Sequence, residues 1–278
     1  MSLMLFTLIM LVGAFLAGLV GSLTGLGGGV IIIPLLTLGL GVDIKYAMGA
    51  SIVSIIATSS GSAAAYVKEG ITNIRVGMFL EIATTIGAII GATLLAYINT
   101  SYIAIFFGCI LIFSAIMMVV KKKSRENNDD TSKLANIFKL NGSYPTPEGV
   151  KEYKVHRVVG GFFMMMFAGV LSGLLAIGSG ALKVIAMDNI MRLPFKVSTT
   201  TSNFMIGVTA AASAIIYLYR GQIEPGIAMP VCLGVLLGAT LGAKLLLRTK
   251  TDKLKIVFAV VIAFLAVQMI YNGIVGNI

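Results

Sequence analysis

Hydrophobic segments separated by short polar or glycine-containing stretches follow one another along almost the whole chain. Ile103 to Val120 contains no charged residue, and Val76 to Leu95 contains only Glu81. A membrane-spanning helix needs about 20 predominantly apolar residues, so this pattern predicts transmembrane helices. The predicted segments are residues 3–23, 27–40, 47–67, 76–98, 102–120, 156–176, 178–191, 197–219, 226–247 and 256–275.

The composition agrees with a membrane protein. Of the 278 residues, 58% are hydrophobic and only 12% are charged, which is too few charges to cover the exterior of a soluble domain. We therefore predict an all-α polytopic protein of the cell membrane. The net charge of +10 is explained by topology and by anionic lipid headgroups at the cytoplasmic loops, so no nucleic-acid partner is expected.

Residues typical of catalytic or metal sites are sparse. The sequence has no paired carboxylates, no histidine cluster and no H-E-x-x-H motif, so it predicts neither an enzyme nor a metal site, and it implies no cofactor. The two cysteines, Cys109 and Cys232, lie within apolar segments and form no disulfide framework. His156, the single histidine, lies in a basic loop, where we expect it to be exposed to solvent.

The two halves of the chain match each other when the sequence is shifted by 151 residues, without a gap over roughly 75 positions. Such internal similarity predicts a duplicated structural unit. The chain therefore divides into a first membrane repeat (1–120), a basic linker (121–157) and a second membrane repeat (158–278), with five hydrophobic segments in each repeat. The matching pairs include Gly18 with Gly169, Ser51 with Ser202, Thr58 with Thr209, Tyr66 with Tyr217, and Gly91 with Gly242.

An odd number of segments per repeat predicts that the two repeats have opposite orientations in the membrane. Cytoplasmic loops are enriched in Lys and Arg. With the linker in the cytoplasm, inverted repeats place 17 Lys and Arg residues inside and two outside. Parallel repeats, in which segments 27–40 and 178–191 dip into the membrane without crossing, place 12 inside and seven outside. Inverted repeats are favoured, with the linker cytoplasmic and both termini outside.

The second segment of the first repeat is short. Residues 27–40 make about 21 Å of helix, whereas the hydrocarbon core is roughly 30 Å thick. The first two segments of each repeat therefore either cross fully or form a re-entrant hairpin. The protein has ten crossings in the first case, or six crossings and two hairpins in the second.

Glycine-rich breaks precede the short segments at equivalent positions of the two repeats. In secondary transporters, paired broken helices in inverted repeats mark the substrate site, and their N-terminal N–H groups suit an anion. Tight packing of the two segments is the alternative explanation. The predicted substrate-binding residues from these breaks are Gly25, Gly27, Gly28, Gly29, Gly178, Ser179 and Gly180.

Polar residues within the hydrophobic segments extend this candidate site. Ser51, Ser202 and Asn203 lie near the starts of equivalent segments, where they either bind an oxyanion or hydrogen-bond to neighbouring helices. Lys183, three residues after Gly180, either supplies positive charge to an anion, titrates for proton coupling, or extends to the interface. Glu81 is a second candidate coupling residue, as a proton site or as the partner of a lysine.

These features resemble the TauE/SafE family of membrane permeases, often described as sulfite exporters. The resemblance rests on Gly18-x-x-Gly21-x-x-x-Gly25-Leu26-Gly27-Gly28-Gly29 followed by Pro34, on Gly49-Ala50-Ser51, on Tyr66 to Gly70, and on the related stretch Gly169 to Gly180. It covers nearly the whole chain except the linker. Ala176 and Ser179 stand where the first repeat has glycines, and Ile185 stands where it has proline, so the two breaks are not equivalent in chemistry.

The resemblance implies transport of sulfite, sulfonates or related small organic anions. We therefore expect a secondary transporter of a small anion, with export favoured, that works by alternating access between the inverted repeats. An anion channel or pore and an uptake permease for another small metabolite are the alternatives. The expected partners are the anionic substrate and the lipid bilayer, and a homo-oligomer is left open.

Overall fold

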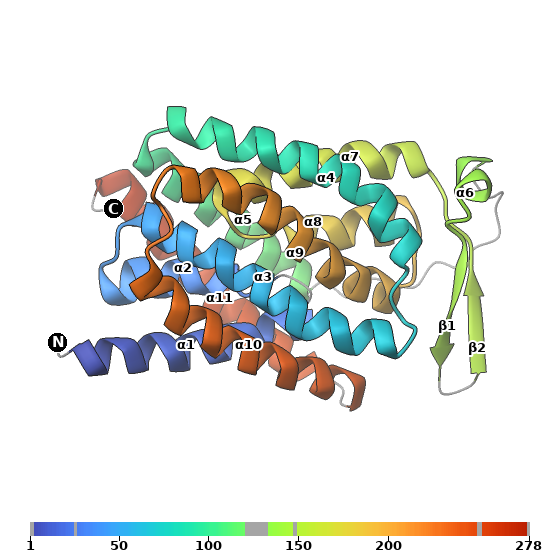
Figure 1. The fold of residues 1–278 in the computed structure, drawn as a ribbon, viewed down its shortest axis with the longest axis horizontal. Coiled ribbons are helices and arrows are strands. Elements are labelled where there is room, and N and C mark those ends of the chain that lie inside the picture. The colour runs from blue at the N-terminus through green and yellow to red at the C-terminus, as the bar shows by residue number, and fades with distance from the viewer. Residues whose placement is uncertain (1–2, 25–26, 120–132, 147–148, 249–251, 277–278) are drawn as a thin grey trace.

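The computed structural model describes residues 3–24, 27–119, 133–146, 149–248 and 252–276. Helices make up nearly all of this structure (Figure 1). They follow the predicted hydrophobic segments closely, and the largest difference is at the start of the last helix, which begins at Asp252 rather than at residue 256.

The first half contains four long helices and one short interrupted helix. The short helix, α2, continues into a π-helical turn, η1, and Pro34 lies at their junction. The elements are α1 (Leu3–Thr24), α2 (Gly29–Pro34), η1 (Leu35–Gly39), α3 (Ile44–Lys68), α4 (Ile74–Leu94), the 3₁₀ turn η2 (Leu95–Tyr97) and α5 (Thr100–Val119).

The second half repeats this order, including a short helix that continues into a π-helical turn. Although Ile185 replaces the proline of the first half, the π-helical turn still forms at the same place. The elements are α7 (Val158–Leu175), α8 (Gly180–Ile185), η3 (Ala186–Ile190), α9 (Phe195–Tyr219), α10 (Pro225–Arg248) and α11 (Asp252–Val275).

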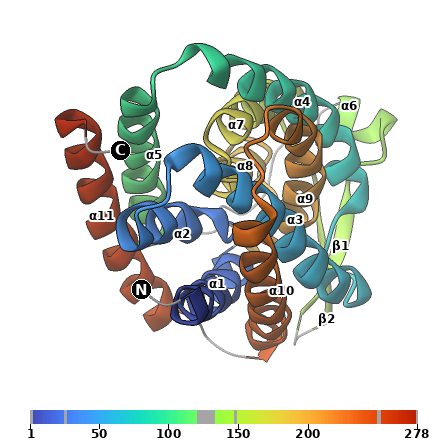
Figure 2. The same cartoon turned by 60° about the vertical axis from the view of Figure 1, so that its left-hand side comes forward.

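Six helices are long and apolar enough to cross a membrane within the described part of the chain: α1, α3, α4, α7, α9 and α10. The two short helices with their π-helical turns span Gly29–Gly39 and Gly180–Ile190. Each is roughly 16 Å long at the α-helical rise, about half of a hydrocarbon core. Figure 2 shows α2 and α8 inside the bundle, and most of their residues are buried.

The linker is not purely irregular. It contains α6 (Lys133–Ile137) and an antiparallel hairpin of β1 (Gly142–Thr146) and β2 (Gly149–Tyr153), in which Gly142 pairs with Tyr153. The prediction of an all-α protein is therefore wrong for this segment. The alternation of polar and apolar residues in a strand of five residues is too short to stand out beside a chain of hydrophobic helices.

The hairpin is attached to the start of α4. The Asn73 side chain donates hydrogen bonds to the Leu140 carbonyl oxygen at 2.9 Å and to the Tyr153 hydroxyl at 2.7 Å. Burial raises the pKa of the Tyr153 phenol, and the hydrogen bond from Asn73 opposes this change. His156 is also buried, so the prediction that it is exposed to solvent is wrong.

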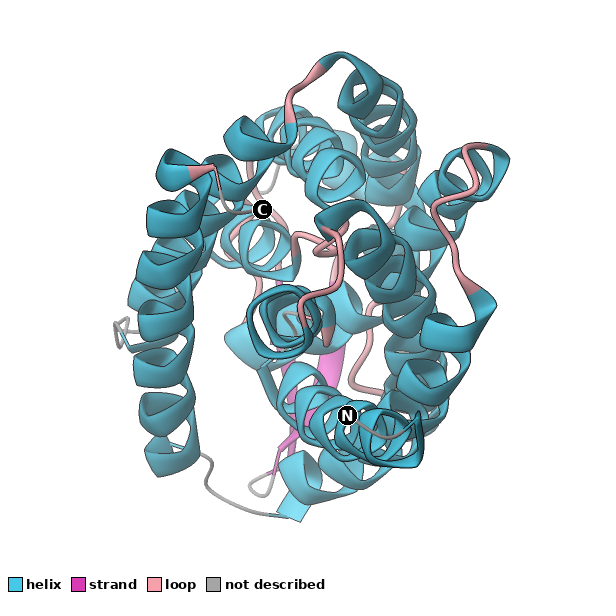
Figure 3. Ribbon diagram, turned by 90° about the vertical axis from the view of Figure 1, so that its left-hand side faces the viewer, coloured by secondary structure: helices cyan, strands magenta, loops and turns pink. Residues whose placement is uncertain are grey.

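The hairpin and the two chain ends lie at opposite ends of the bundle. Figure 1 shows both termini at the left and β1, β2 and α6 at the right. Figure 3, seen from the end with the termini, shows the strands behind the helices.

Helices from the two halves pack across each other, α1 against α10 and α4 against α7. Glycine makes this close approach possible because a side chain would meet the facing main chain. A methyl group added at Gly18 would collide with the main chain of Val235, and one added at Gly169 would collide with that of Thr84. Val235 and Thr84 are themselves related by the same shift of 151 residues.

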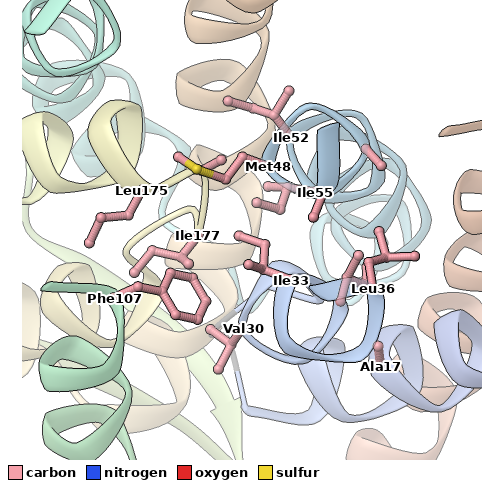
Figure 4. Packing of buried hydrophobic residues seen from close by; sticks show 14 of the residues in the cluster. Ala17, Val30, Ile33, Leu36, Met48, Ile52, Ile55, Phe107, Leu175 and Ile177 are labelled. Carbon is pink, nitrogen blue, oxygen red and sulfur yellow. The ribbon is translucent and has the colours of Figure 1, made fainter. Parts of the chain in front are cut away.

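The centre of the bundle is an apolar cluster around the two short helices. Figure 4 shows Val30 and Ile33 of α2 close to Phe107 of α5 and to Ile177, which precedes α8. All four side chains are buried. The cluster therefore joins the two halves at the places where their helices are interrupted.

Candidate functional site

The two glycine-containing breaks meet at the centre of the bundle. A methyl group added at Gly29 would lie 3.0 Å from the carbonyl oxygen of Ala176, in the break of the other half. Gly27 and Gly178 have positive φ angles of 80° and 72°, which residues with a side chain rarely adopt. Backbone conformation thus favours glycine at positions 27 and 178, and close approach favours it at position 29. Gly25 lies outside the described residues.

The hydroxyl of Ser51 links α3 to the opposite break. Its Oγ donates a hydrogen bond of 2.7 Å to the Ala176 carbonyl oxygen. In the other half, the Ser202 Oγ donates to the Gly180 carbonyl oxygen at 3.3 Å. Both serines are fully buried. The structure thus brings Ser51 and Ser202 to the breaks, where each serine binds a main-chain carbonyl.

Asn203 also contacts the first half. Its side-chain amide donates a hydrogen bond of 3.2 Å to the Ser22 main-chain carbonyl oxygen. Its main-chain carbonyl oxygen accepts a hydrogen bond of 2.6 Å from the Ser59 hydroxyl. Asn203 and Ser59 are buried. These bonds connect α9 to both α1 and α3, so the polar faces of α3 and α9 are in contact at the centre of the bundle.

Ser179 has a different environment from the other site residues. Its Oγ is buried and has no hydrogen-bond partner among the described residues, and its backbone is left-handed, with a φ of 44°. A buried hydroxyl without a partner costs free energy, typically about 1–3 kcal/mol, and its presence in a native structure calls for an explanation. A bound polar molecule would provide one.

A small cavity adjoins Ser179. Its volume is about 10 Å³, enough for roughly one water molecule. Residues from α2, α5, the second break and α8 line it: Val30, Ile110, Ser114, Ile177, Ser179, Gly180, Ala181 and Leu182. In this arrangement the cavity is therefore closed to a polyatomic anion.

Lys183 and Glu81 come together on the other side of α8. The Lys183 ammonium donates to the Thr209 hydroxyl at 2.5 Å, and that hydroxyl donates to Glu81 Oε1 at 2.5 Å. Lys183 and Thr209 have no exposed surface, and Glu81 is 7% exposed. Lys183 does not line the cavity. It pairs with the carboxylate through a threonine.

The structure also identifies site residues that sequence analysis missed. Ile110 and Ser114 of α5 line the cavity, although α5 has no glycine break and its apolar sequence resembles any membrane helix. Thr209 was noted only as the repeat mate of Thr58. A serine in an otherwise apolar segment was the available signal for Ser114, but such residues commonly bond to their own helix, as Ser114 does to the Ile110 carbonyl.

The described part of the chain contains no cluster of side chains that could bind a metal ion. No group of three or more His, Cys, Asp or Glu side chains is placed there to hold an ion. The polar groups at the centre are hydroxyls, one amide, one ammonium and one carboxylate. Hydroxyl and amide donors suit hydrogen bonding to an oxyanion.

Known proteins similar to this chain are membrane transporters by name. Residues 10–269 match the family described as sulfite exporter TauE/SafE. The chain is 29% identical to the probable membrane transporter protein YunE of Bacillus subtilis, over 96% of this chain and 98% of that one. It is 26% identical to the probable membrane transporter protein YdhB of the same organism, over 83% and 86%.

Similarity extends to an archaeal protein. The probable membrane transporter protein MJ0441 of Methanocaldococcus jannaschii is 25% identical, over 96% of each chain. No solved structure matches. With the six candidate spans, these relatives identify a multi-pass membrane protein.

Proposed function

This chain belongs to the sulfite exporter TauE/SafE family, and we propose that it is a secondary transporter of a small anion such as sulfite or a sulfonate. Export is the direction that the family description suggests. The observation that carries the proposal is the meeting of the two breaks with Ser51, Ser202 and Asn203 at a closed centre. Paired broken helices at a repeat interface are typical of secondary transporters.

Inverted orientation of the two repeats is part of this proposal. It requires two equivalent units, and the equivalent contacts that matching residues make support that requirement. The Tyr66 hydroxyl donates to the Ser22 carbonyl oxygen at 3.0 Å, and the Tyr217 hydroxyl donates to the Gly173 carbonyl oxygen at 2.9 Å. Tyr66 and Tyr217 differ by 151 in residue number, and so do Ser22 and Gly173. Two such units related by a pseudo-two-fold axis can exchange roles as one side closes and the other opens.

Alternating access would begin from the closed centre. The hydroxyls of Ser51 and Ser202 donate to main-chain carbonyls in this arrangement, while the Ser179 hydroxyl is unused. As the breaks separate, all three hydroxyls and the Asn203 amide become available as donors to an entering anion. The anion then replaces the carbonyl oxygens as acceptor, so Ser51, Ser202 and Asn203 keep a partner in both states and the Ser179 hydroxyl gains one.

Sidedness follows from the same proposal. The linker, with its nine Lys and Arg residues, would face the cytoplasm, and both termini would lie outside. Cysteine labelling of intact cells tests this arrangement. In a background without Cys109 and Cys232, a cysteine at residue 277 should react with an impermeant maleimide, whereas one in the β1–β2 hairpin, such as Ser143→Cys, should react only after permeabilisation.

The experiment for transport uses the purified protein in vesicles. Sealed proteoliposomes loaded with labelled sulfite, or with a labelled short alkyl sulfonate, should release it faster than equally loaded liposomes without protein. The release rate should saturate with anion concentration. Ser51→Ala and Ser179→Ala should slow this flux. Ser60→Ala is the matched control, because Ser60 lies on the same helix as Ser51 but is exposed and bonds its own helix at Ile56.

Two results would contradict the proposal. Absence of flux for every tested anion by folded protein would exclude anion transport. Flux that rises linearly with concentration without saturation would instead favour the anion channel.

A further inference from the structure

A chain of two hydrogen bonds joins three buried side chains from three helices. Lys183 of α8 donates to the Thr209 hydroxyl of α9, which donates in turn to Glu81 Oε1 of α4. A threonine hydroxyl has one proton and two lone pairs, so it can accept from the lysine and donate to the carboxylate at once. We call this arrangement the Lys–Thr–Glu bridge.

One carboxylate oxygen of the bridge lacks a hydrogen-bond partner among the described residues. Glu81 Oε2 is buried and has no hydrogen-bond partner among the described residues, whereas Oε1 also accepts a longer bond of 3.4 Å from Thr85. Because a buried carboxylate oxygen without a partner is costly, this atom is the place where the bridge can take up a proton. Protonation there would leave the bonds of Thr209 in place.

Among the described residues on the elements around the bridge, the other ionisable side chains are exposed, partly exposed or bonded elsewhere. α7, which packs against α4, contains no ionisable residue. On α9, Lys196 and Tyr219 are exposed, and the Tyr217 hydroxyl bonds the Gly173 carbonyl. Arg75 of α4 is exposed, and Asp188 of η3 is partly exposed. Lys183 and Glu81 are therefore the ionisable groups that set the local charge.

The bridge is adjacent to the cavity of the candidate site. The Lys183 main-chain N–H donates to the Ser179 carbonyl oxygen at 3.1 Å, so Ser179 and Lys183 are joined by the first turn of α8. The partnerless Ser179 hydroxyl lines the cavity. The bridge and the cavity are thus one helical turn apart, in an interior where charges are weakly screened. A change in the net charge of the bridge therefore changes the electrostatic potential in the cavity.

We propose that the Lys–Thr–Glu bridge binds one proton together with each transported anion, which makes the protein a proton–anion symporter. This proposal rests on the proposed function. In the resting bridge, the ammonium and the carboxylate sum to zero charge. A hydronium ion then gives up its proton: one of its O–H bonds breaks, an O–H bond forms at Glu81 Oε2, and a water molecule leaves. The bridge now carries one positive charge, which a monoanion in the cavity neutralises.

Release reverses these steps. When the anion leaves, the uncompensated positive charge in the interior expels the proton from Glu81 to water. Anion and proton therefore enter and leave together in a ratio of one to one. Either direction of net transport is compatible with this mechanism, because the two gradients decide it.

The test measures accumulation in proteoliposomes. A short alkyl sulfonate is the probe, since it stays ionised and does not cross the lipid as a neutral acid. The sulfonate starts at equal concentration on both sides, valinomycin with equal potassium holds the membrane potential at zero, and a pH difference is imposed. Symport predicts accumulation on the alkaline side by about tenfold per pH unit at equilibrium.

Variants then assign the coupling to the bridge. Glu81→Gln should still pass sulfonate down its gradient but should lose the accumulation driven by pH. Glu81→Gln combined with Lys183→Met leaves no unpaired charge and should lose it too, which covers the case where the single variant does not fold. Cys232→Ser is the control at the position equivalent to Glu81, and it should accumulate sulfonate like the parent protein.

Each outcome has a distinct meaning. Accumulation on the acidic side, or none in the parent protein despite downhill flux, would overturn the proton symport and leave anion transport intact. Full accumulation in a folded Glu81→Gln or double variant would overturn the role of the bridge. Absence of any sulfonate or sulfite flux in the parent protein would overturn the proposed function itself.

Discussion

The two halves of this protein share a backbone plan but differ in buried chemistry. Lys183 and Thr209 of the second half meet Glu81 of the first half, with the Thr209 hydroxyl between the two charged groups. The positions equivalent to these three residues are Ile32, Thr58 and Cys232. Ile32 is buried in the apolar cluster, and the Thr58 hydroxyl bonds the Ser54 carbonyl in its own helix at 2.9 Å. Within the described residues, the duplicated framework thus holds the charged bridge at only one of two equivalent places.

The breaks differ in the same way. Gly28 of the first break is replaced by Ser179 in the second, and only the second break brings a side-chain hydroxyl to the cavity. The contacts that hold the helices together have been kept in both halves, because they depend on glycine and on main-chain carbonyls. The groups that would act on a ligand can vary without disturbing those contacts.

The largest expected effect is at the bridge. Lys183→Met leaves Glu81 buried and unpaired, and breaking a buried pair in this way typically costs about 3–5 kcal/mol. We expect a large loss of thermal stability, measured by size-exclusion chromatography after heating in detergent. Adding Glu81→Gln should restore most of that loss. A double variant as unstable as the single one would contradict the pairing.

A matched pair of glycine substitutions tests the shared framework. Gly18→Ala and Gly169→Ala each place a methyl group against the main chain of the facing helix. Overpacking of this kind typically costs about 1–3 kcal/mol, and we expect similar losses for the two variants. Gly39→Ala is the control, since the nearest atom to its added methyl is 3.8 Å away, at Leu35. Unequal losses would show that the two crossings are not equivalent.

The smallest effect is expected at the paired tyrosines. Tyr66→Phe and Tyr217→Phe each remove one hydrogen bond to a main-chain carbonyl. Each loss should cost about 1 kcal/mol, and the same heating assay should give nearly equal shifts for both variants. A large shift for one tyrosine alone would mean that its half depends more strongly on this contact.

Much of the fold could be predicted from the sequence because its signals are local. Runs of apolar residues set the helix positions, and the glycine-rich stretches indicated where the two short helices begin. The β1–β2 hairpin was missed, since ten residues with weak alternation carry little signal. His156 was expected at the surface because basic loops are usually exposed to solvent. In the structure, its main-chain N–H donates a hydrogen bond of 3.0 Å to the Met191 carbonyl oxygen.

The candidate site could be predicted only in part. Ser51, Ser202 and Asn203 were predicted to bind substrate from their places near the starts of equivalent segments, and that role stays a prediction. The structure places the Ser51 and Ser202 hydroxyls at the second break, whereas Asn203 bonds Ser22 and Ser59. The role of Lys183 was left between an anion partner, a titrating group and an interfacial side chain. Its interaction with Thr209 and Glu81 depends on α4, α8 and α9 packing together, and no local sequence pattern encodes that arrangement.

The sequence by itself determined that this chain enters the membrane, that its halves are duplicated, and where its helices break. Segment length, hydropathy and glycine spacing are properties of neighbouring residues, so they can be seen without a fold. The tertiary structure decided which buried groups meet. Glu81 and Thr209 are 128 residues apart in the chain, and only the packing of helices from both halves places one hydroxyl between a lysine and a carboxylate.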